Sequence, residues 1–443
     1  MNTTLKNAAR WLAVLCGVAA ACTAALGWGV LHLLRPAPGE WTEVLRLGRW
    51  QQTVSMPTLL RMATHPFTLG LLEGRTLNTR LGPVKVSAGA KPGTWELVCA
   101  PCSFVRGELG HERIVLSRVA FTLERELGMK LHGTVALGDA PNLVQGRWSA
   151  HIEPAGAELK FSLSPTPLAH AFGLFASAIA ELVHAHIEGS IGLSARLRLP
   201  SGELMLKPRI DGFSVSGLGT EALRGAVPTC AAPAPTTSFG PWLPRAVIAA
   251  EDQRFYEHAG YDLTEIMAAW SGNQRAVAEQ DDSETQTERE RPRGASTLSQ
   301  QLAKLVYTGD RPSHSRKLRE LLYAVELDRT LGKARVLNLY LAMAPWGDGQ
   351  CGAHAAALNL LGKRASALTP VEAAWLASLL RNPNAALASM ARTGEVDVKR
   401  VGGVIANMRP MAATRRSAAL EELSLGGLGT CGLRPVSTCV TAH

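Results

Sequence analysis

The sequence lacks any long internal repeat and any of the compositional biases that mark fibrous or wholly disordered chains. Cysteine is scarce, with eight residues, and aromatic residues make up only 5% of the chain. With 443 residues, 46% of them hydrophobic, the chain is long enough for two or three domains with cores of their own. We therefore expect a multidomain globular protein.

Acidic residues are too few to balance the basic ones, and the formal net charge is +9. This balance favours contact with an anionic partner, such as nucleic acid, phospholipid headgroups or a phosphorylated substrate. Charge alone does not choose among these three classes.

No charged residue occurs between Trp11 and Leu34, and an arginine bounds this stretch on each side. At about 1.5 Å per residue, a helix of this length would cross a bilayer of about 30 Å. The sequence thus predicts a transmembrane helix over residues 11–34 after a cytoplasmic tail over residues 1–10. A cleaved signal peptide is the alternative, although its apolar core is usually shorter. Since no second such segment follows, we expect the remaining chain to lie outside the cytoplasm, which excludes nucleic acid as a partner.

Six cysteines remain for that oxidising compartment once Cys16 and Cys22 are assigned to the apolar stretch. Cys99 and Cys102 form a single Cys-x-x-Cys motif, with no second ligand pair for zinc and no redox-fold pattern around it. A structural disulfide or a pair of free thiols is the interpretation we favour.

Apolar and polar residues alternate from roughly residue 75 to 220, as in Val119, Phe121 and Leu123. A period of two is typical of strands with one buried face, so we predict a mostly antiparallel, β-rich domain over residues 36–225. It contains no catalytic constellation and is best interpreted as a spacer or a protein-binding module. A proline-rich stretch over residues 226–241 then predicts a linker.

Beyond the linker the hydrophobic period changes to 3.6, which predicts a mainly helical domain over residues 242–400 and a tail over residues 401–443. The polar stretch from Asn273 to Arg291 predicts a mobile loop. At the start of the helical domain, Glu251 opens the motif Glu-Asp-x-x-Phe-x-x-His-x-Gly-x-Asp, where an apolar helix ends. A carboxylate at such a place can be partly desolvated, which raises its pKa and suits general acid or base catalysis. Taken alone, Glu251 is more often a surface residue or half of an ion pair.

Two further segments carry polar residues in a helical arrangement. Residues 294–304 read Gly-Ala-Ser-Thr-Leu-Ser-Gln-Gln-Leu-Ala-Lys, with hydroxyl residues at a predicted helix start and with Gln300 and Lys304 one turn apart. Arg316, Lys317 and Glu320 lie on the polar face of the next predicted helix. These residues could bind a diphosphate and a metal ion, or they could form a capped surface helix and an ordinary salt bridge.

In this order, the three segments and the glycine-containing stretch from Trp346 to Lys363 resemble the glycosyltransferase family 51 domain of monofunctional peptidoglycan transglycosylases and class A penicillin-binding proteins. The resemblance covers about residues 240 to 390. It implies a mainly α, lysozyme-like catalytic domain, which makes the whole chain an α+β multidomain protein with an N-terminal transmembrane helix. It also implies a peptidoglycan glycosyltransferase of cell-wall biogenesis that polymerises lipid II into glycan strands with release of undecaprenyl diphosphate. The chain would then lie in the inner membrane, single-pass, with its catalytic domain in the periplasm.

Residue by residue, the resemblance makes Glu251 the catalytic base and Glu320 the second catalytic carboxylate, associated with the leaving group and with Mg²⁺ or Mn²⁺. Substrate-binding positions would be Asp252, Phe255, His258, Ser296, Thr297, Gln300, Gln301, Lys304, Arg311, Arg316 and Lys317. Arg311 matches only if one residue is inserted after it. The membrane-dipping surface would correspond to the apolar face with Leu263, Ile266, Met267 and Trp270, although core packing is nearly as good an explanation for it.

The sequence departs from the family pattern at Ala295, Leu305 and Ala342, which puts rate and substrate details in doubt. Neither Lys-Thr-Gly nor Ser-x-x-Lys occurs, so we expect a monofunctional enzyme without a transpeptidase. Two alternatives remain open: a divergent, weakly active member that acts as a lipid II or glycan-binding scaffold, and a lytic enzyme of the same shape. The implied partners are lipid II, the nascent glycan strand and the cytoplasmic membrane, and the β-rich domain could bind another wall-synthesis protein.

Overall fold

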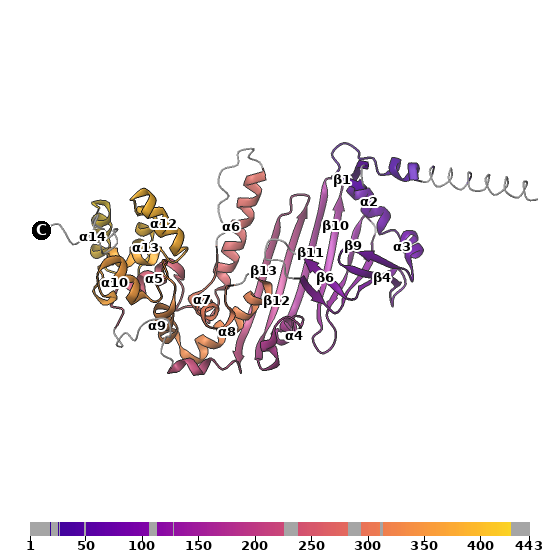
Figure 1. Cartoon of the computed structure of the whole chain (residues 1–443). Helices are drawn as coiled ribbons and strands as arrows, with labels where there is room; N and C mark the ends of the chain where they lie inside the picture. Colours follow the sequence, from indigo (N-terminus) through magenta and orange to yellow (C-terminus); the bar gives the residue numbers. More distant parts are fainter. Residues whose placement is uncertain are drawn as a thin grey trace, which may run out of the picture. The chain divides into compact units, whose positions relative to one another are not determined.

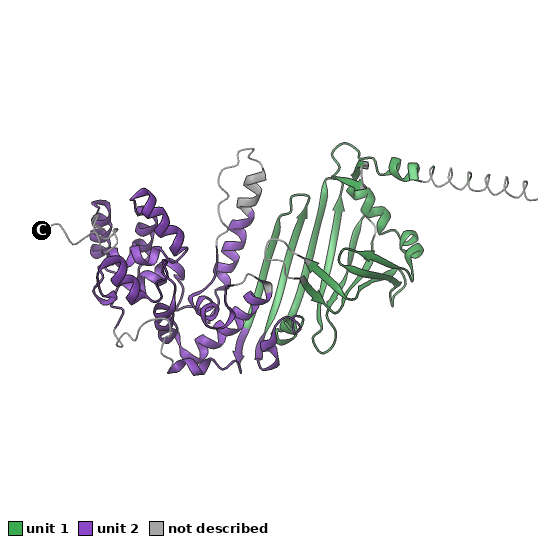
Figure 2. Ribbon diagram, in the orientation of Figure 1, with its two compact units in different colours: residues 1–104, 113–174, 190–211 green, residues 105–112, 175–189, 212–443 purple. Residues whose placement is uncertain are grey.

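The computed structural model describes residues 18, 25, 27–47, 50–105, 113–126, 128–225, 238–281, 294–310 and 313–426. They fall into two compact units (Figure 2). Unit 1 comprises residues 1–104, 113–174 and 190–211, and unit 2 comprises residues 105–112, 175–189 and 212–443.

The predicted transmembrane helix over residues 11–34 requires a correction. Within the described part of the chain, no helix is both long enough and apolar enough to cross a membrane. Of the predicted stretch, residues 11–17, 19–24 and 26 lie outside the described residues, and a helical segment covers residues 27–33.

Unit 1 is built on strands that pair antiparallel with their neighbours, as β10 does with both β9 and β11 (Figure 1). The large sheet has nine strands in the order β13-β12-β11-β10-β9-β8-β5-β4-β3. Its strands are β3 (Thr76–Thr79), β4 (Gly82–Ala88), β5 (Thr94–Cys99), β8 (Val119–Arg125), β9 (Lys130–Leu137), β10 (Val144–Glu153), β11 (Gly156–Pro167), β12 (His186–Leu199) and β13 (Leu204–Ser216). The first residues of β12, 186–189, and the last of β13, 212–216, are assigned to unit 2. The β-rich antiparallel domain predicted from the period of two is confirmed.

Smaller elements complete this unit. Two further sheets of two strands pair β1 (Thr42–Leu47) with β2 (Trp50–Ser55), and β6 (Cys102–Val105) with β7 (Arg113–Leu116). The helices are α2 (Met56–Ala63), α3 (Pro66–Leu72) and α4 (Leu168–Gly173). Cys99 and Cys102 form a disulfide and are buried in a small apolar cluster with Leu116 and Val119, so the structure shows the first of the two predicted alternatives, a structural bridge.

Unit 2 is mainly helical, as the change of period predicted. Its helices are α5 (Leu243–Glu251), α6 (Leu263–Asp281), α7 (Leu298–Ala303), α8 (His314–Leu331), α9 (Lys333–Met343), α10 (Ala353–Leu361), α11 (Pro370–Ser378), α12 (Pro383–Thr393), α13 (Val398–Asn407) and α14 (Ala413–Ser424), with a π-helical turn, η4, over Lys304–Thr308. Helix α11 lies at the centre of the core and contacts α5, α13 and α14. It is apolar around nearly its whole circumference, as a fully surrounded helix has to be.

The helices extend beyond the boundaries that periodicity indicated. Helix α6 continues to Asp281, through the first part of the predicted loop, because that part is rich in good helix formers. Helices α13 and α14 lie in the predicted tail, and α13 buries Val401 and Ile405 completely. The linker residues 226–237, loop residues 282–291 and residues 427–443 with Cys431 and Cys439 lie outside the described residues.

Residues 175–189 and 212–225 precede the predicted linker and belong to unit 2. Glu326 of α8 accepts hydrogen bonds from the backbone N–H of Leu218 at 3.1 and 2.9 Å. The hydroxyls of Thr220 and Thr330 are hydrogen-bonded at 2.7 Å. Arg319 of α8 forms an ion pair with Glu181 at 2.5 Å. Polar pairing with α8, which periodicity cannot reveal, therefore places these residues with the helices.

Candidate active site

Glu251 is the last residue of helix α5, whose other buried positions are apolar. Its side chain is only 13% exposed and lies 3.7 Å from the guanidinium of Arg400, carboxylate oxygen to Nη2. Burial raises the pKa of the Glu251 carboxyl above its ordinary value, and the charge of Asp252 adds to this. A hydrogen bond from Gln301 and the charges of Arg400 and Arg381 oppose the shift. Glu251 is thus a partly desolvated carboxylate held ready to accept a proton.

Two hydrogen bonds in series fix the orientation of this carboxylate. The hydroxyl of Tyr340, on α9, donates to Oε1 of Gln301 at 2.8 Å, and Nε2 of Gln301 donates to Oε2 of Glu251 at 3.1 Å. Because an amide oxygen can only accept and its NH₂ can only donate, Tyr340 determines which end of the amide faces Glu251. Burial raises the pKa of Tyr340 well above its usual range, so its hydroxyl stays a donor.

The sequence motif predicted Gln301 as a site residue, but no pattern in the sequence indicated Tyr340 or Arg400 as members of this group. Tyr340 occupies an apolar helix at a core position, and Arg400 lies at the boundary predicted for the domain's end. No local pattern marked either residue, because their roles arise from contacts across 39 and 149 positions of the chain, respectively.

Replacing Tyr340 with phenylalanine is expected to lower kcat by about fivefold, which corresponds to the roughly 1 kcal/mol of one buried hydrogen bond. KM should change little, because the hydroxyl acts on the base through Gln301. Steady-state kinetics of the purified variant measures both constants. An unchanged kcat would show that Gln301 is oriented without Tyr340.

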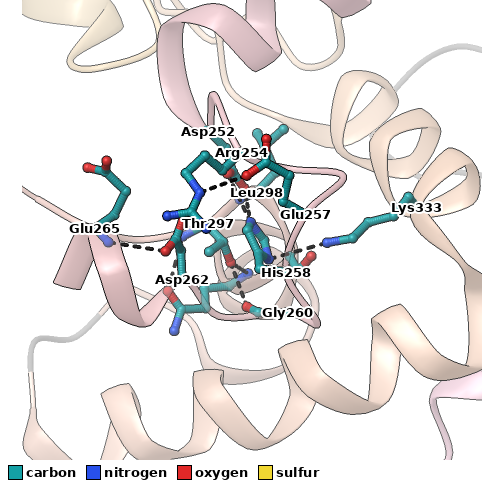
Figure 3. A network of polar contacts seen from close by, with 12 residues as sticks. Asp252, Arg254, Glu257, His258, Gly260, Asp262, Glu265, Thr297, Leu298 and Lys333 are labelled. Atoms are coloured by element: carbon teal, nitrogen blue, oxygen red, sulfur yellow. Dashed lines mark hydrogen bonds and ion pairs between the residues drawn. The ribbon is translucent and has the colours of Figure 1, made fainter. Parts of the chain in front are cut away.

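Asp252 and His258, two residues of the motif that Glu251 opens, belong to a buried polar network (Figure 3). Oδ1 and Oδ2 of Asp252 lie 3.0 and 3.2 Å from Nε2 of His258, and Oδ2 also accepts from the backbone N–H of Leu298 at 2.9 Å. Nζ of Lys333 lies 3.3 Å from Nδ1 of His258. A neutral imidazole with its proton on Nε2 satisfies both neighbours. Asp252 therefore ties the end of α5 to the start of α7.

Thr297 and Gln300 complete this scaffold. They form a capping box at the start of α7, in which the Thr297 hydroxyl accepts from the Gln300 backbone N–H and the Gln300 amide oxygen accepts from the Thr297 N–H. The Thr297 hydroxyl also donates to the carbonyl of Gly260 at 2.7 Å. Gly260 has a φ of +89°, and a Cβ there would lie 2.5 Å from the carbonyl oxygen of Ala324 on α8. Only glycine permits this close approach.

Phe255 is completely buried, with Nζ of Lys333 4.4 Å from the centre of its ring. Like the side chains of Asp252, His258, Thr297 and Gln300, its side chain contacts other residues of the protein. In this structure these five residues hold the loop after α5 against α7 and α9.

A second group gathers cations at the start of α8. Glu320 is 1% exposed and pairs with Nη1 of Arg316 at 2.9 Å and with Nζ of Lys317 at 2.7 Å. Lys317 also donates to the hydroxyl of Ser296 at 2.7 Å. Nζ of Lys304 lies 2.5 Å from Asp310, whose pKa this lysine lowers. With one buried carboxylate against two cations, the cluster of Ser296, Arg316, Lys317 and Glu320 keeps a net positive charge. Arg311 lies outside the described residues.

The donor set around Glu320 does not by itself hold a divalent cation. No cluster of three or more histidine, cysteine, aspartate or glutamate residues suited to a metal occurs in the described ranges. Both carboxylate oxygens of Glu320 face basic groups, whereas Mg²⁺ prefers at least one or two free carboxylates together with substrate oxygens. The metal at Glu320 stays a prediction.

Helix α7 joins the two groups, because Ser296 directly precedes its N-cap and Gln301 lies within it. The arrangement combines a desolvated carboxylate that can remove a proton with cations that can neutralise an anionic leaving group. Such a pair suits the transfer of a phosphate-activated carbon onto a hydroxyl.

Comparison with known proteins gives consistent matches for this unit. The family model described as transglycosylase matches residues 228–409. A biosynthetic peptidoglycan transglycosylase of Nitrosomonas eutropha is 41% identical over 141 residues, which cover 32% of this chain and 53% of that protein. The protein of the same name from Citrobacter koseri is 36% identical over 195 residues, covering 44% and 73%. The one from Shigella boydii is 43% identical over 145 residues, covering 33% and 55%. The chain thus spans about half the length of the first and the third.

Proposed function

The chain belongs to the biosynthetic peptidoglycan transglycosylase family, and from this premise we propose that its helical unit polymerises lipid II into glycan strands and releases undecaprenyl diphosphate. The observation that carries the proposal is the buried Glu251 carboxylate, oriented by Gln301 within the same unit as the cationic cluster. The proposed enzyme is a monofunctional peptidoglycan glycosyltransferase.

In the proposed reaction, the 4-hydroxyl oxygen of the acceptor sugar forms a bond to C1 of the donor sugar. Glu251 takes the hydroxyl proton as that bond forms. The bond between C1 and the diphosphate oxygen breaks, and its electron pair leaves with the diphosphate. Arg316, Lys317 and Lys304 are the cations available to neutralise the charge that develops there, and the Lys317 side chain is 51% exposed and can reach a ligand.

We further propose that the chain works in the periplasm at the membrane surface, where a lipid-linked substrate resides. The Cys99–Cys102 disulfide supports an oxidising compartment. Leu263, Ile266, Met267 and Trp270 follow one face of α6 at helical spacing and are each only partly buried, which supports their contact with lipid. A wall-synthesis partner bound to the β-rich unit is part of the same proposal.

Incubation of the full chain with lipid II in detergent and Mg²⁺ tests the function, with glycan strands separated by electrophoresis as the readout. Strands longer than the input disaccharide support the polymerase. Binding of lipid II without turnover would favour the scaffold, and shortening of preformed glycan would favour the lytic enzyme.

Arg400 provides a test of the base by pH. Glu251 must be ionised to act, so the rate should fall as the pH drops through its raised pKa. Because Arg400 lowers that pKa, Arg400→Gln should move the acidic limb of the kcat/KM profile to higher pH. Arg400→Lys keeps the positive charge, so its acidic limb should lie between those of Arg400→Gln and the wild type. The exposed Arg392 gives the control, since Arg392→Gln should leave the limb in place. An unmoved limb in Arg400→Gln would show that another group controls it.

A further inference from the structure

A groove of about 1010 Å³ lies in unit 2, apart from the residues assigned to catalysis. It is lined from the start of α5, the loop that follows α5, the connection between α13 and α14, and the first turn of α14. The lining residues that matter here are Trp242, Arg245, Tyr256, Arg409, Arg415 and Arg416. No aspartate or glutamate is among the residues that line the groove.

The arginines of this groove differ in the hydrogen bonds that they form. Arg416 is structural, because its Nη2 donates to the carbonyls of Met408 and Met411 at 3.3 and 3.1 Å and so shapes the connection before α14. Arg245, Arg409 and Arg415, in contrast, form no ion pair with any carboxylate that the structure describes. Since hydrogen bonds to carbonyls leave Arg416 charged as well, four guanidinium groups keep their positive charge in one groove, and three of them, Arg245, Arg409 and Arg415, do not shape the backbone as Arg416 does.

Trp242 holds two of these cations in position. The guanidinium carbons of Arg245 and Arg415 lie 5.2 and 5.3 Å from the centre of the indole ring. A cation–π contact fixes the plane of a guanidinium but leaves its N–H donors unsatisfied. Two like charges held against one ring repel each other, and an anion bound to both guanidinium groups would offset that repulsion.

The number of donors indicates the chemical class of this anion. Each guanidinium presents up to five N–H donors in a planar fork, and a carboxylate offers only two acceptor oxygens. A phosphate group offers more acceptor oxygens and more negative charge, and arginine binds it in a bidentate manner. We propose that the groove formed by Trp242, Arg245, Arg409 and Arg415 is a second, non-catalytic phosphate-binding site, filled by a phospholipid headgroup or by free phosphate.

Chemical modification of arginine tests this site in the full chain without any substitution. Phenylglyoxal modifies accessible arginines, and mass spectrometry of peptides gives the rate at each one. Inorganic phosphate, at ionic strength matched with chloride, should slow modification of Arg409 and Arg415 several-fold. Arg364 and Arg392, which are exposed and lie outside the groove, should react at an unchanged rate.

Vesicles distinguish the two sources of phosphate. If phosphatidylglycerol vesicles protect Arg409 and Arg415 while phosphatidylcholine vesicles do not, the headgroup is the ligand. If only inorganic phosphate protects them, the ligand is free phosphate. Protection by neither, equal protection of all four arginines, or protection by muropeptide carboxylates alone would overturn the proposal.

A variant tests whether the arginines act together. Arg409→Gln should abolish most of the phosphate protection of Arg415, whereas Arg364→Gln should not change it. Full protection of Arg415 in Arg409→Gln would contradict a shared site. Modification of Arg316 in the same experiment reports on the catalytic cluster, so a failure of this proposal is distinguishable from a failure of the proposed function.

Discussion

Replacement of Glu251 by glutamine is expected to lower the rate of glycan polymerisation by about 10²- to 10⁴-fold, the contribution typical of a positioned general base. Glutamine is nearly isosteric, and its amide oxygen can still accept the hydrogen bond from Nε2 of Gln301, so the fold of α5 should persist. What the variant loses is the ability to take the proton of the attacking hydroxyl. The measurement is the initial rate at saturating lipid II, with binding of lipid II determined separately.

Glu257 supplies the matched control for this experiment. It lies six positions further along the same motif, its side chain is 64% exposed, and it pairs with Arg254 at the surface at 3.0 Å. Glu257→Gln should therefore leave the rate within a factor of two or so, as expected for an exposed ion pair worth at most about 1 kcal/mol. If Glu251→Gln retained more than about a tenth of the wild-type rate, the base would have to be another group.

The second large effect is expected on stability, from Asp252→Ala. Asp252 accepts hydrogen bonds from His258 and from the backbone N–H of Leu298, and all three groups are buried. Each donor left without a partner costs about 1–3 kcal/mol, so we expect unit 2 to lose about 2–6 kcal/mol. Since the chain has two units, hydrogen exchange localises the loss better than a single melting temperature. Peptides that cover residues 297–303 should exchange much faster.

Two companion variants make this result interpretable. Asp252→Asn keeps one acceptor oxygen for Leu298 and should lose less stability than Asp252→Ala. Glu395→Ala removes an exposed carboxylate and should change stability by no more than about 0.5 kcal/mol. Unaltered exchange of residues 297–303 in Asp252→Ala would show that α7 is held in place by its apolar contacts alone.

Five residues of the motifs point into the protein, and they show what a local sequence pattern can and cannot predict. They are Asp252, Phe255, His258, Thr297 and Gln300. Thr297 and Gln300 were recognisable as a helix start, and the structure gives them a capping box. Asp252 and His258 were predicted to contact substrate, which stays a prediction, and the structure shows that inside the protein they are also bound by Leu298 and Lys333. A motif shows which residue types occur together, and it does not show which way each side chain points.

Unit boundaries show the same limit. Residues 175–189 and 212–225 belong to the helical unit through Glu181, Leu218 and Thr220, whose partners all lie on α8. These contacts join residues more than 100 positions apart. Hydrophobic periodicity reports only on neighbours along the chain, so it could not detect them.

By itself, the sequence determined the antiparallel strands, the helical unit, the family and the position of Glu251 at a helix end, because each of these depends on short-range pattern and spacing. Only the tertiary structure decided that Tyr340 orients Gln301, that Arg400 opposes the pKa shift of Glu251, and that Arg245 and Arg415 meet at Trp242 in a groove that Arg409 also lines. Within the described residues it also showed no helix long and apolar enough to cross a membrane, which corrects the predicted transmembrane helix over residues 11–34. The physical reason is that desolvation, hydrogen-bond partners and local charge are properties of three-dimensional neighbourhoods, which bring together residues that the chain keeps far apart.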